Sequence, residues 1–162
     1  MKIKIVSIVL VCLAMVMLSG CATSQEKAVR DAELAKQVTA ALAERNYKIG
    51  VRTMIPHRGS SQNVSFNYSL EVRNDSLISY LPYFGEVYNV PYGGGKGLNF
   101  SERIGSYQES QKKNGSRHIE IGVKNDEDTY LYMIDVFSNG SSTITVQARQ
   151  RQRISYTGAM TF

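Results

Sequence analysis

From Asn46 onward, apolar and polar residues alternate with a period of two, and this alternation constrains the fold more than any other feature. Successive side chains of a β-strand point to opposite faces, so the period predicts strands with one covered face. Turn-forming residues separate these strands at short intervals, most plainly at 74–75, 125–128 and 138–141. Connections this short favour an antiparallel order of neighbouring strands.

A different period precedes the strands. Ala28, Ala32, Ala35, Val38 and Leu42 recur at intervals of three or four, which predicts one helix of about twenty residues. The stripe is mostly alanine, so we expect the helix to lie close against a sheet; a tether or a coiled coil is the competing interpretation. The fold class predicted is α+β, with one N-terminal helix packed on a curled, largely antiparallel β-meander of about seven or eight strands. The meander is expected to curl around the helix or to close partly into a barrel.

The first residues have the pattern of a bacterial export signal. Lys2 and Lys4 precede an apolar stretch, residues 5–18, that is short for a membrane span. Leu18-Ser19-Gly20-Cys21 resembles the lipobox of bacterial lipoproteins, in which the cysteine thiol receives a diacylglycerol. We therefore expect residues 1–20 to be a signal peptide that is removed, residues 21–33 to form the lipid-anchored N-terminus and the start of the helix, and residues 34–162 to form a single α+β domain.

Removal of this signal changes the chemistry available to the chain. The formal net charge falls from +5 to +3 when Lys2 and Lys4 leave, which weakens any argument for a nucleic-acid partner. Cys12 leaves as well and Cys21 carries the lipid, so no thiol would remain for a disulfide, a zinc site or a nucleophile. The expected partner is the membrane, reached through acyl chains on Cys21.

The residues after Cys21 indicate where in the cell envelope the protein is expected to lie. No aspartate follows Cys21 directly, unlike the inner-membrane retention signal of some Gram-negative bacteria, and no acidic cluster follows it, unlike surface-export signals. We expect a lipid-anchored protein of the cell envelope, in the outer membrane and facing the periplasm.

No catalytic constellation stands out. The histidines His57 and His118 are expected to be exposed and ordinary, and neither a G-x-S-x-G elbow nor an H-E-x-x-H motif is present. The acidic run 126–128 has no EF-hand spacing and is interpreted as a solvated turn. Nothing in the sequence pairs Glu102, Glu109 and Glu120 as glycosidase carboxylates. The chain is predicted not to be an enzyme and to need no metal or cofactor.

Two basic or glycine-rich segments invite a binding interpretation. Residues 93–97 contain a Gly-Lys pair but lack the first glycine and the Ser or Thr of a phosphate loop, so that interpretation is rejected. Arg149, Arg151 and Arg153 alternate with other residues; they either form a charged turn, which is the simpler account, or line up guanidinium groups for phosphate or lipid head groups.

Two stretches carry a family resemblance: SLISYLPYFGEVYNVPYGGGKGLNF and DVFSNGSSTITVQARQRQRISYTGAM. Together they resemble the domain of unknown function 4251 family of Bacteroidetes envelope lipoproteins, over roughly residues 34–162. The resemblance implies a lipoprotein with a single domain, and it carries over no activity and no catalytic residue. In the same bacteria, Asp75-Ser76-Leu77 resembles a short O-glycosylation acceptor, although a plain turn is the better interpretation of it.

The aromatic and glycine-rich stretch at 80–97 is the candidate binding loop. Pro82 is unsuited to a central strand, so the chain should leave the sheet there, and the tyrosines are expected to fold over the sheet. The candidate ligand contacts are Tyr80, Tyr83, Phe84, Tyr88 and Tyr92. The hypothesis is a non-catalytic envelope lipoprotein, a binding or structural module with a carbohydrate or protein partner. An envelope hydrolase with an unrecognised site and an inhibitor-like protein acting on a partner enzyme are the alternatives.

Overall fold

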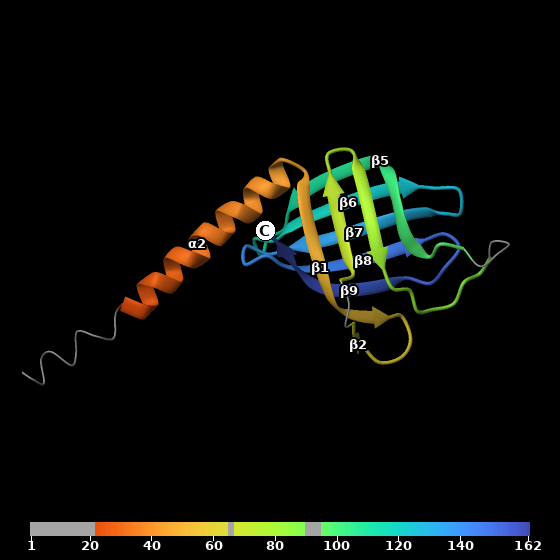
Figure 1. Cartoon of the computed structure of the whole chain (residues 1–162), viewed down its shortest axis with the longest axis horizontal. Helices are drawn as coiled ribbons and strands as arrows, with labels where there is room; N and C mark the ends of the chain where they lie inside the picture. The colour runs from red at the N-terminus through yellow and green to blue at the C-terminus, as the bar shows by residue number, and fades with distance from the viewer. Residues whose placement is uncertain (1–21, 65–66, 90–94) are drawn as a thin grey trace, which may run out of the picture.

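The structure, a computed structural model, describes residues 22–64, 67–89 and 95–162. In these three segments one helix is followed by nine strands (Figure 1). The elements are α2 (Ala22–Ala43), β1 (Asn46–Pro56), β2 (Gln62–Asn63), β3 (Ser69–Arg73), β4 (Ser76–Leu81), β5 (Leu98–Gln111), β6 (Arg117–Lys124), β7 (Thr129–Val136), β8 (Ser141–Ala148) and β9 (Ile154–Thr161).

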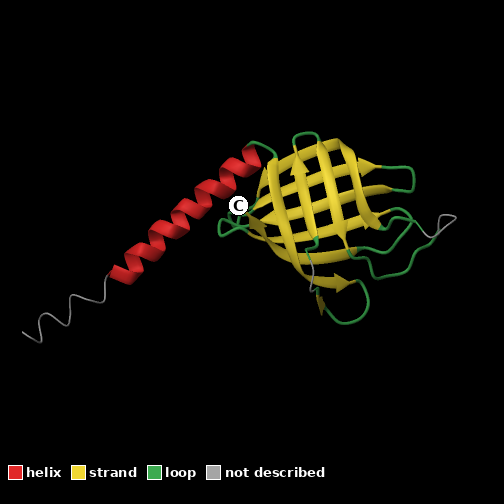
Figure 2. Cartoon of the chain, in the orientation of Figure 1, coloured by secondary structure: helices red, strands yellow, loops and turns green. Residues whose placement is uncertain are grey.

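The strands form a closed antiparallel barrel. From β3 to β9 each strand pairs with the next one along the chain, and β1 pairs with both β3 and β9, so that eight strands complete a ring (Figure 2). The short β2 is an additional strand that pairs with the second half of β1. The predicted α+β class, with one helix and a largely antiparallel meander, is confirmed. Of the two arrangements expected for the meander, curling around the helix or closing partly into a barrel, the structure has the barrel, and its ring is complete.

The alternation in the sequence predicts a strand over residues 64–72 and separate strands over 99–104 and 106–109. In the structure β3 begins at Ser69, and residues 99–104 and 106–109 belong to the single strand β5, which has an irregularity of register between Ile104 and Ser106. Residues 130–137 are apolar at nearly every position, and this run predicts a strand covered on both faces. In β7, however, Leu131 and Met133 lie on the outer face of the barrel and are only half-buried.

The seam between β1 and β9 depends on a glycine. The register of this pair shifts between Val51 and Thr53, which is the signature of a β-bulge. Gly158 lies opposite Val51, and a Cβ atom built on Gly158 would be 2.1 Å from the carbonyl oxygen of Gly50. Only a residue without a side chain allows the two backbones to approach this closely.

The inward-facing side chains fill the barrel. Along most strands buried residues alternate with half-buried or exposed ones, as expected for a sheet with one covered face. Three tyrosines, Tyr130, Tyr132 and Tyr156, are almost completely buried, and Phe100 packs against two of them with ring centroids 4.8 and 6.4 Å away. The remaining interior is mainly aliphatic, with Ile49, Leu70, Val72, Leu77, Leu81, Leu98, Ile119, Ile121, Ile134, Ile144 and Val146 among its members.

The hydroxyl groups of these tyrosines hold the two ends of the β4–β5 connection. Tyr156 donates a hydrogen bond of 2.6 Å to the carbonyl oxygen of Pro82, and Tyr130 donates one of 3.3 Å to that of Gly97. Tyr132 donates to Ser79 Oγ at 3.0 Å. Burial raises the pKa of the Tyr132 and Tyr156 hydroxyls far above their ordinary value, so both stay protonated and able to donate. The long loop is therefore attached to the inside of the barrel at both ends.

Replacing Tyr156 with phenylalanine should loosen that attachment. We expect the change to lower the free energy of unfolding by about 1–2 kcal/mol, because the Pro82 carbonyl loses its partner. Urea denaturation measures the stability, and amide hydrogen exchange over residues 83–89 should become faster. Tyr80→Phe is the control, since Tyr80 is half exposed; an equal loss of stability in both variants would contradict the proposed attachment.

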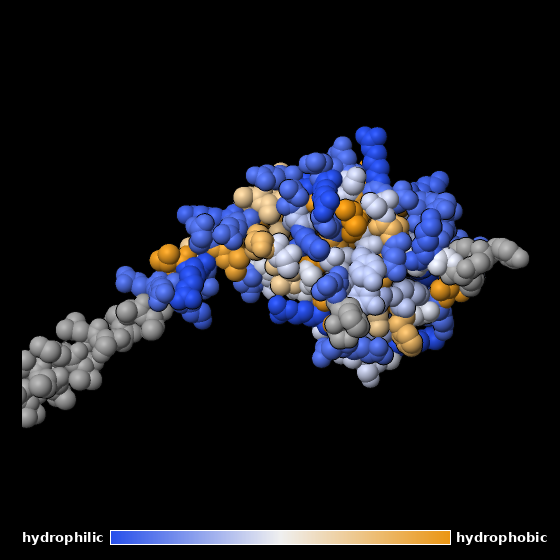
Figure 3. All heavy atoms as spheres, viewed as in Figure 1, coloured by the Kyte–Doolittle hydropathy of each residue, from blue (hydrophilic) through white to orange (hydrophobic). Residues whose placement is uncertain are grey.

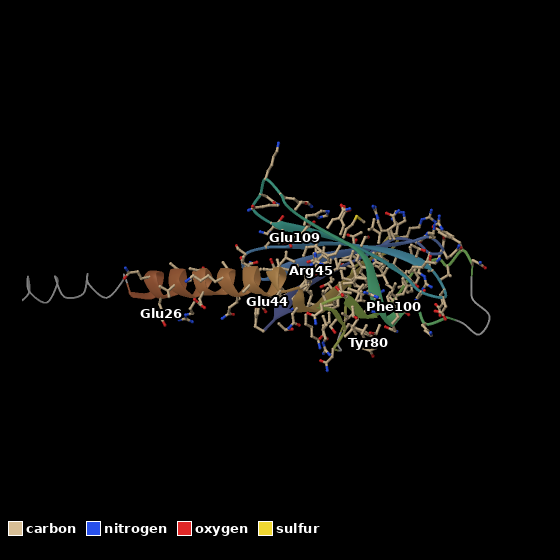
Figure 4. All side chains as sticks on the ribbon, turned by 90° about the horizontal axis from the view of Figure 1, so that it is seen from above. Glu26, Glu44, Arg45, Tyr80, Phe100 and Glu109 are labelled. Atoms are coloured by element: carbon tan, nitrogen blue, oxygen red, sulfur yellow. The ribbon has the colours of Figure 1, made fainter. Side chains whose placement is uncertain are left out.

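The helix contacts the barrel only through its last turns. Val38 and Leu42 are buried, whereas Ala28 and Ala32 are exposed, so the first half of the alanine stripe is not covered by the sheet. Figure 4 shows the helix standing off the barrel, with Glu26 far from it and Glu44 at the junction. Arg45 has a positive φ of 49° and turns the chain into β1. In the described part of the chain, no helix has the length and hydropathy of a membrane-spanning segment.

Candidate functional site

The connections between consecutive strands lie at two opposite ends of the barrel. In an antiparallel meander alternate connections lie at the same end. The described residues of three of them, 82–89 with 95–97, 125–128 and 149–153, lie with the C-terminal end of β1 at one end, which we call the loop end. The helix joins the barrel at the opposite end, next to the C-terminus (Figure 1).

A buried arginine lies at the centre of the loop end. Only 5% of the surface of Arg151 is exposed. Its Nη2 atom lies 3.7 Å from Glu127 Oε2 and its Nε atom lies 3.6 Å from Asp128 Oδ2. The guanidinium carbon is 5.4 Å from the ring centre of Tyr83 and 5.8 Å from that of Tyr130, within the range of cation–π contacts. A buried charge needs such partners, because desolvation is costly.

The acidic run 126–128 is therefore not the solvated turn that was expected. Asp128 is buried, and its carboxylate accepts hydrogen bonds from the backbone N–H groups of Thr129, Arg149 and Gln150, at 2.7–3.1 Å. Glu127 accepts a bond of 2.7 Å from the backbone N–H of Lys96. The run does form the β6–β7 turn, but two of its carboxylates join three loops together.

The β4–β5 connection pairs with the β8–β9 turn. Val87 forms an isolated antiparallel bridge with Arg151, and the N–H of Tyr88 donates to the carbonyl of Gln150 at 2.7 Å. The N–H of Gln152 donates to the carbonyl of Glu86 at 3.0 Å. Within this pairing Arg151 is buried, whereas Arg149 and Arg153 are exposed. The expected charged turn is present, but its central arginine is a buried residue.

The polar contacts of this cluster are incomplete among the residues that the structure describes. Among the described residues, three buried side-chain atoms have no hydrogen-bond partner: Asn125 Nδ2, Glu127 Oε2 and Arg151 Nε. Buried polar atoms are nearly always hydrogen-bonded, so three unpaired atoms in one cluster are unusual. They mark the loop end as the candidate functional site.

Two open hollows flank this cluster, and Gln152 lines both. The first, of about 340 Å³, is lined by His57, Tyr88, Gln147, Ala148, Arg151, Gln152 and Arg153. The second, of about 370 Å³, is lined by Arg58, Tyr83, Phe84, Gly85, Glu86 and Gln152. Their volumes lie at the lower end of the range for small-molecule sites, which is about 300–1,000 Å³.

The predicted aromatic contacts separate into exposed and packed residues. Phe84 and Tyr88 are 56% and 64% exposed beside the two hollows. Tyr80 is 50% exposed, but it lies on the outer face of β4, where it packs on Tyr68 with the ring centroids 5.2 Å apart (Figure 4). Tyr92 lies outside the described residues, as does Cys21.

Tyr83 is held within the loop. Its hydroxyl lies 2.9 Å from the Glu86 carbonyl oxygen and 3.1 Å from that of Gln152, and donates toward them. Burial raises the pKa of Tyr83, and the neighbouring Arg151 charge partly offsets this. Tyr83 therefore fits the expectation that tyrosines of this stretch fold over the sheet.

The two histidines lie apart. His57 is exposed at the loop end, as expected, whereas His118 is not an ordinary exposed residue. His118 Nδ1 lies 2.8 Å from Asp135 Oδ1 and its Nε2 lies 3.2 Å from Glu120 Oε1. Ser110 is the strand partner of His118 on β5, but the Nε2 atom faces Glu120, which does not match the order of a serine hydrolase relay. Within residues 22–64, 67–89 and 95–162, no group of three or more His, Cys, Asp or Glu side chains is placed to hold a metal ion.

Asp135 makes stability depend on pH. Partial burial raises the pKa of Asp135, but hydrogen bonds from Lys112 and His118 outweigh this and lower the pKa below its ordinary value. The ionised carboxylate therefore stabilises the fold above the pKa of the unfolded chain, about 4, and this contribution is lost as the pH falls through the lower pKa of the folded state. We expect Asp135→Asn to lower stability at pH 7 by on the order of 1 kcal/mol, and the difference from the wild type to shrink below about pH 4. Urea denaturation at pH 7 and pH 3 measures both; a constant difference would contradict the assignment.

The Arg151 cluster was not predicted from the sequence. Its members come from three connections separated by 20 to 70 residues, and the two connections that carry most of its charges, 125–128 and 149–153, each look like an ordinary polar turn when taken alone. One signal was available: in a meander the turns at 125–128 and 149–153 must share an end, and one is acidic while the other is basic. Opposite charges on adjacent turns indicate an ion pair between them.

Comparisons with known proteins place the chain in a family. The model of the domain of unknown function DUF4251 matches residues 29–160. The chain is similar to the crystal structure of a DUF4251 family protein from Bacteroides eggerthii, with a TM-score of 0.63 and 14% sequence identity, over 82% of this chain and 89% of that one. Comparison with curated proteins gave no match. At this identity the structural likeness shows the fold, and the family model covers most of the sequence: the chain belongs to the DUF4251 family.

Proposed function

We propose that the protein is a lipid-anchored, non-catalytic binding module of the cell envelope. In this proposal residues 1–20 are removed and acyl chains on Cys21 hold the protein in the outer membrane, facing the periplasm. The lipobox pattern Leu18-Ser19-Gly20-Cys21 supports the anchor. Ala22, the first described residue, already lies in α2.

The helix then acts as a spacer. Its 22 residues span about 33 Å at 1.5 Å per residue, and most of its length is exposed. Figure 3 shows hydrophilic side chains along the exposed helix, with hydrophobic ones between them. Val29 of this helix is 68% exposed. A helix attached at the membrane would hold the barrel away from it with the loop end on the far side.

One observation carries the binding proposal: the end of the barrel opposite the helix combines exposed aromatic rings with two hollows. Phe84 and Tyr88 stand beside these hollows on a backbone held by Arg151, Asp128 and Tyr83. Exposed aromatic side chains on a rigid frame are common anchors of carbohydrate and peptide ligands. We infer that the loop end takes such a ligand from the periplasm.

The experiment compares binding of the chain to glycan and peptide arrays. The double variant Phe84→Ala with Tyr88→Ala should lose the array signal. Phe162→Ala is the matched control, since Phe162 is also 64% exposed but lies at the helix end. Equal signals from the double variant and the wild type would refute the role of the loop end.

The anchor is tested separately. Cys21→Ser should abolish incorporation of labelled palmitate and release the protein from the membrane fraction. Palmitate labelling that persists in this variant would rule out Cys21 as the lipid-bearing residue.

A further inference from the structure

Not every basic side chain of the loop end lies near a carboxylate. Each of its carboxylates lies near a basic group: Glu86 and Arg58 are 3.6 Å apart, Asp126 and Lys96 are 3.6 Å apart, and Glu127 and Asp128 share Arg151. Arg149 and Arg153 have no ion-pair partner among the described residues, and residues 65–66 and 90–94 contain no Asp or Glu that could supply one. The loop end therefore has positive charge left over.

This charge lies beside one of the two hollows. The hollow of about 340 Å³ is lined by His57, Tyr88, Gln147, Ala148, Arg151, Gln152 and Arg153, and these residues include no Asp or Glu. Glu127 and Asp128 more than balance the charge of Arg151, so Arg153 is the basic side chain of this hollow that has no carboxylate partner among the described residues. The other hollow is different, because Glu86 and Arg58 line it together.

The backbone that carries Arg153 is already held in place. Asp128 accepts hydrogen bonds from the N–H groups of Arg149 and Gln150, and residues 86–88 pair with 150–152. A ligand would therefore meet a preformed rim, which lowers the entropic cost of binding. Guanidinium groups bind carboxylate and phosphate oxygens through paired hydrogen bonds.

Tyr88 adds a requirement for the shape of the ligand. Its ring is 64% exposed and lines the same hollow, so it offers a flat apolar surface next to the charge. The volume suits a molecule of about the size of a monosaccharide.

We infer that this hollow binds a carboxylate or phosphate group carried on a small ring-containing molecule, with Arg153 and His57 facing the anion and Tyr88 against the ring. The inference rests on the proposed function, since it names the ligand chemistry of the same loop end.

The test uses residues 21–162 carrying Cys21→Ser, which keep every described residue. The probes are glucuronic acid, glucose 6-phosphate and glucose, titrated by NMR. We expect the two anions to bind and glucose to bind at least about tenfold more weakly, because it has no charge for Arg153. Arg153→Gln should weaken the anions about five- to tenfold and leave glucose unchanged. Arg103→Gln, at an exposed position of β5 with the same change of charge, should have no effect.

Vesicles separate two sources of the anion. Phosphatidylcholine vesicles with and without phosphatidylinositol, whose head group carries a phosphate on a ring, are sedimented with the protein. Recruitment to phosphatidylinositol that is lost in Arg153→Gln and reversed by glucose 6-phosphate identifies a lipid head group; binding of the soluble anions without recruitment identifies a free one. If glucose binds as tightly as the anions, or Arg153→Gln behaves as Arg103→Gln, the anion site is overturned. The binding proposal would then still be decided by the array experiment with Phe84 and Tyr88.

Discussion

Replacing Asp128 with asparagine is expected to lower the free energy of unfolding by about 3–5 kcal/mol, the range seen when one partner of a buried ion pair is removed. Arg151 would keep its charge in a site with 5% exposure and lose one of its two carboxylates. Asparagine would also turn an amide group toward backbone N–H groups that now donate to a carboxylate. Urea denaturation followed by circular dichroism measures the change.

Asp126→Asn is the matched control. Asp126 is in the same turn and also faces a basic residue, Lys96, but its side chain is 71% exposed. Ion pairs at such exposed positions contribute at most about 1 kcal/mol, so the control should be nearly neutral. Similar stabilities for Asp128→Asn and Asp126→Asn would show that the buried cluster does not hold the loop end together.

Replacing Gly158 with alanine is expected to cost about 3 kcal/mol or more, at the upper end of the range for overpacking. The new methyl group would lie 2.1 Å from the Gly50 carbonyl oxygen and 3.1 Å from the Val51 Cα atom. Both obstacles are backbone atoms, so a side-chain rotation cannot relieve the contact. The β1–β9 ladder would have to separate at the bulge, and thermal unfolding should report a large drop in Tm.

Gly50→Ala serves as the control, since Gly50 lies on the other strand of the same seam. A Cβ atom there would be 3.6 Å from the nearest atom, the Cγ2 of Thr161, which is an ordinary contact distance. We expect this variant to keep its Tm within a few degrees. A wild-type Tm for Gly158→Ala would mean that the seam can shift, and the stated reason for a glycine would be wrong.

Much of the fold was available from the sequence because local rules decide it. Period-two alternation and short polar turns place the strands from β6 to β9, and the Asn74-Asp75 turn before β4 is as expected, with Asn74 at a positive φ of 53°. The closure of the barrel does not follow from these local rules. The pairing of β1 with β9 joins residues about 100 positions apart and depends on sheet twist and on the bulge near Val51, for which the period gives no signal.

The candidate site was harder to predict for a similar reason. Tyr83 and Tyr88 both belong to the aromatic stretch, yet one is packed and the other exposed. The difference comes from Arg151 and Gln152, almost 70 residues further on, which take the ring and the hydroxyl of Tyr83. An irregular loop has no periodic pattern of buried and exposed residues. The sequence could therefore name the aromatic residues of this stretch as a group, but it could not show which of their rings are exposed.

The closed ring has a consequence for a protein concentrated on a surface. Each of the eight barrel strands has a hydrogen-bonded neighbour on both sides. The barrel therefore leaves few unpaired backbone N–H and C=O groups with which a strand of another molecule could pair. Molecules tethered to a bilayer meet one another far more often than molecules free in solution, and open sheet edges would then invite fibril-like association. Under the proposed anchoring, closure lets many copies crowd on one leaflet while each remains a separate molecule.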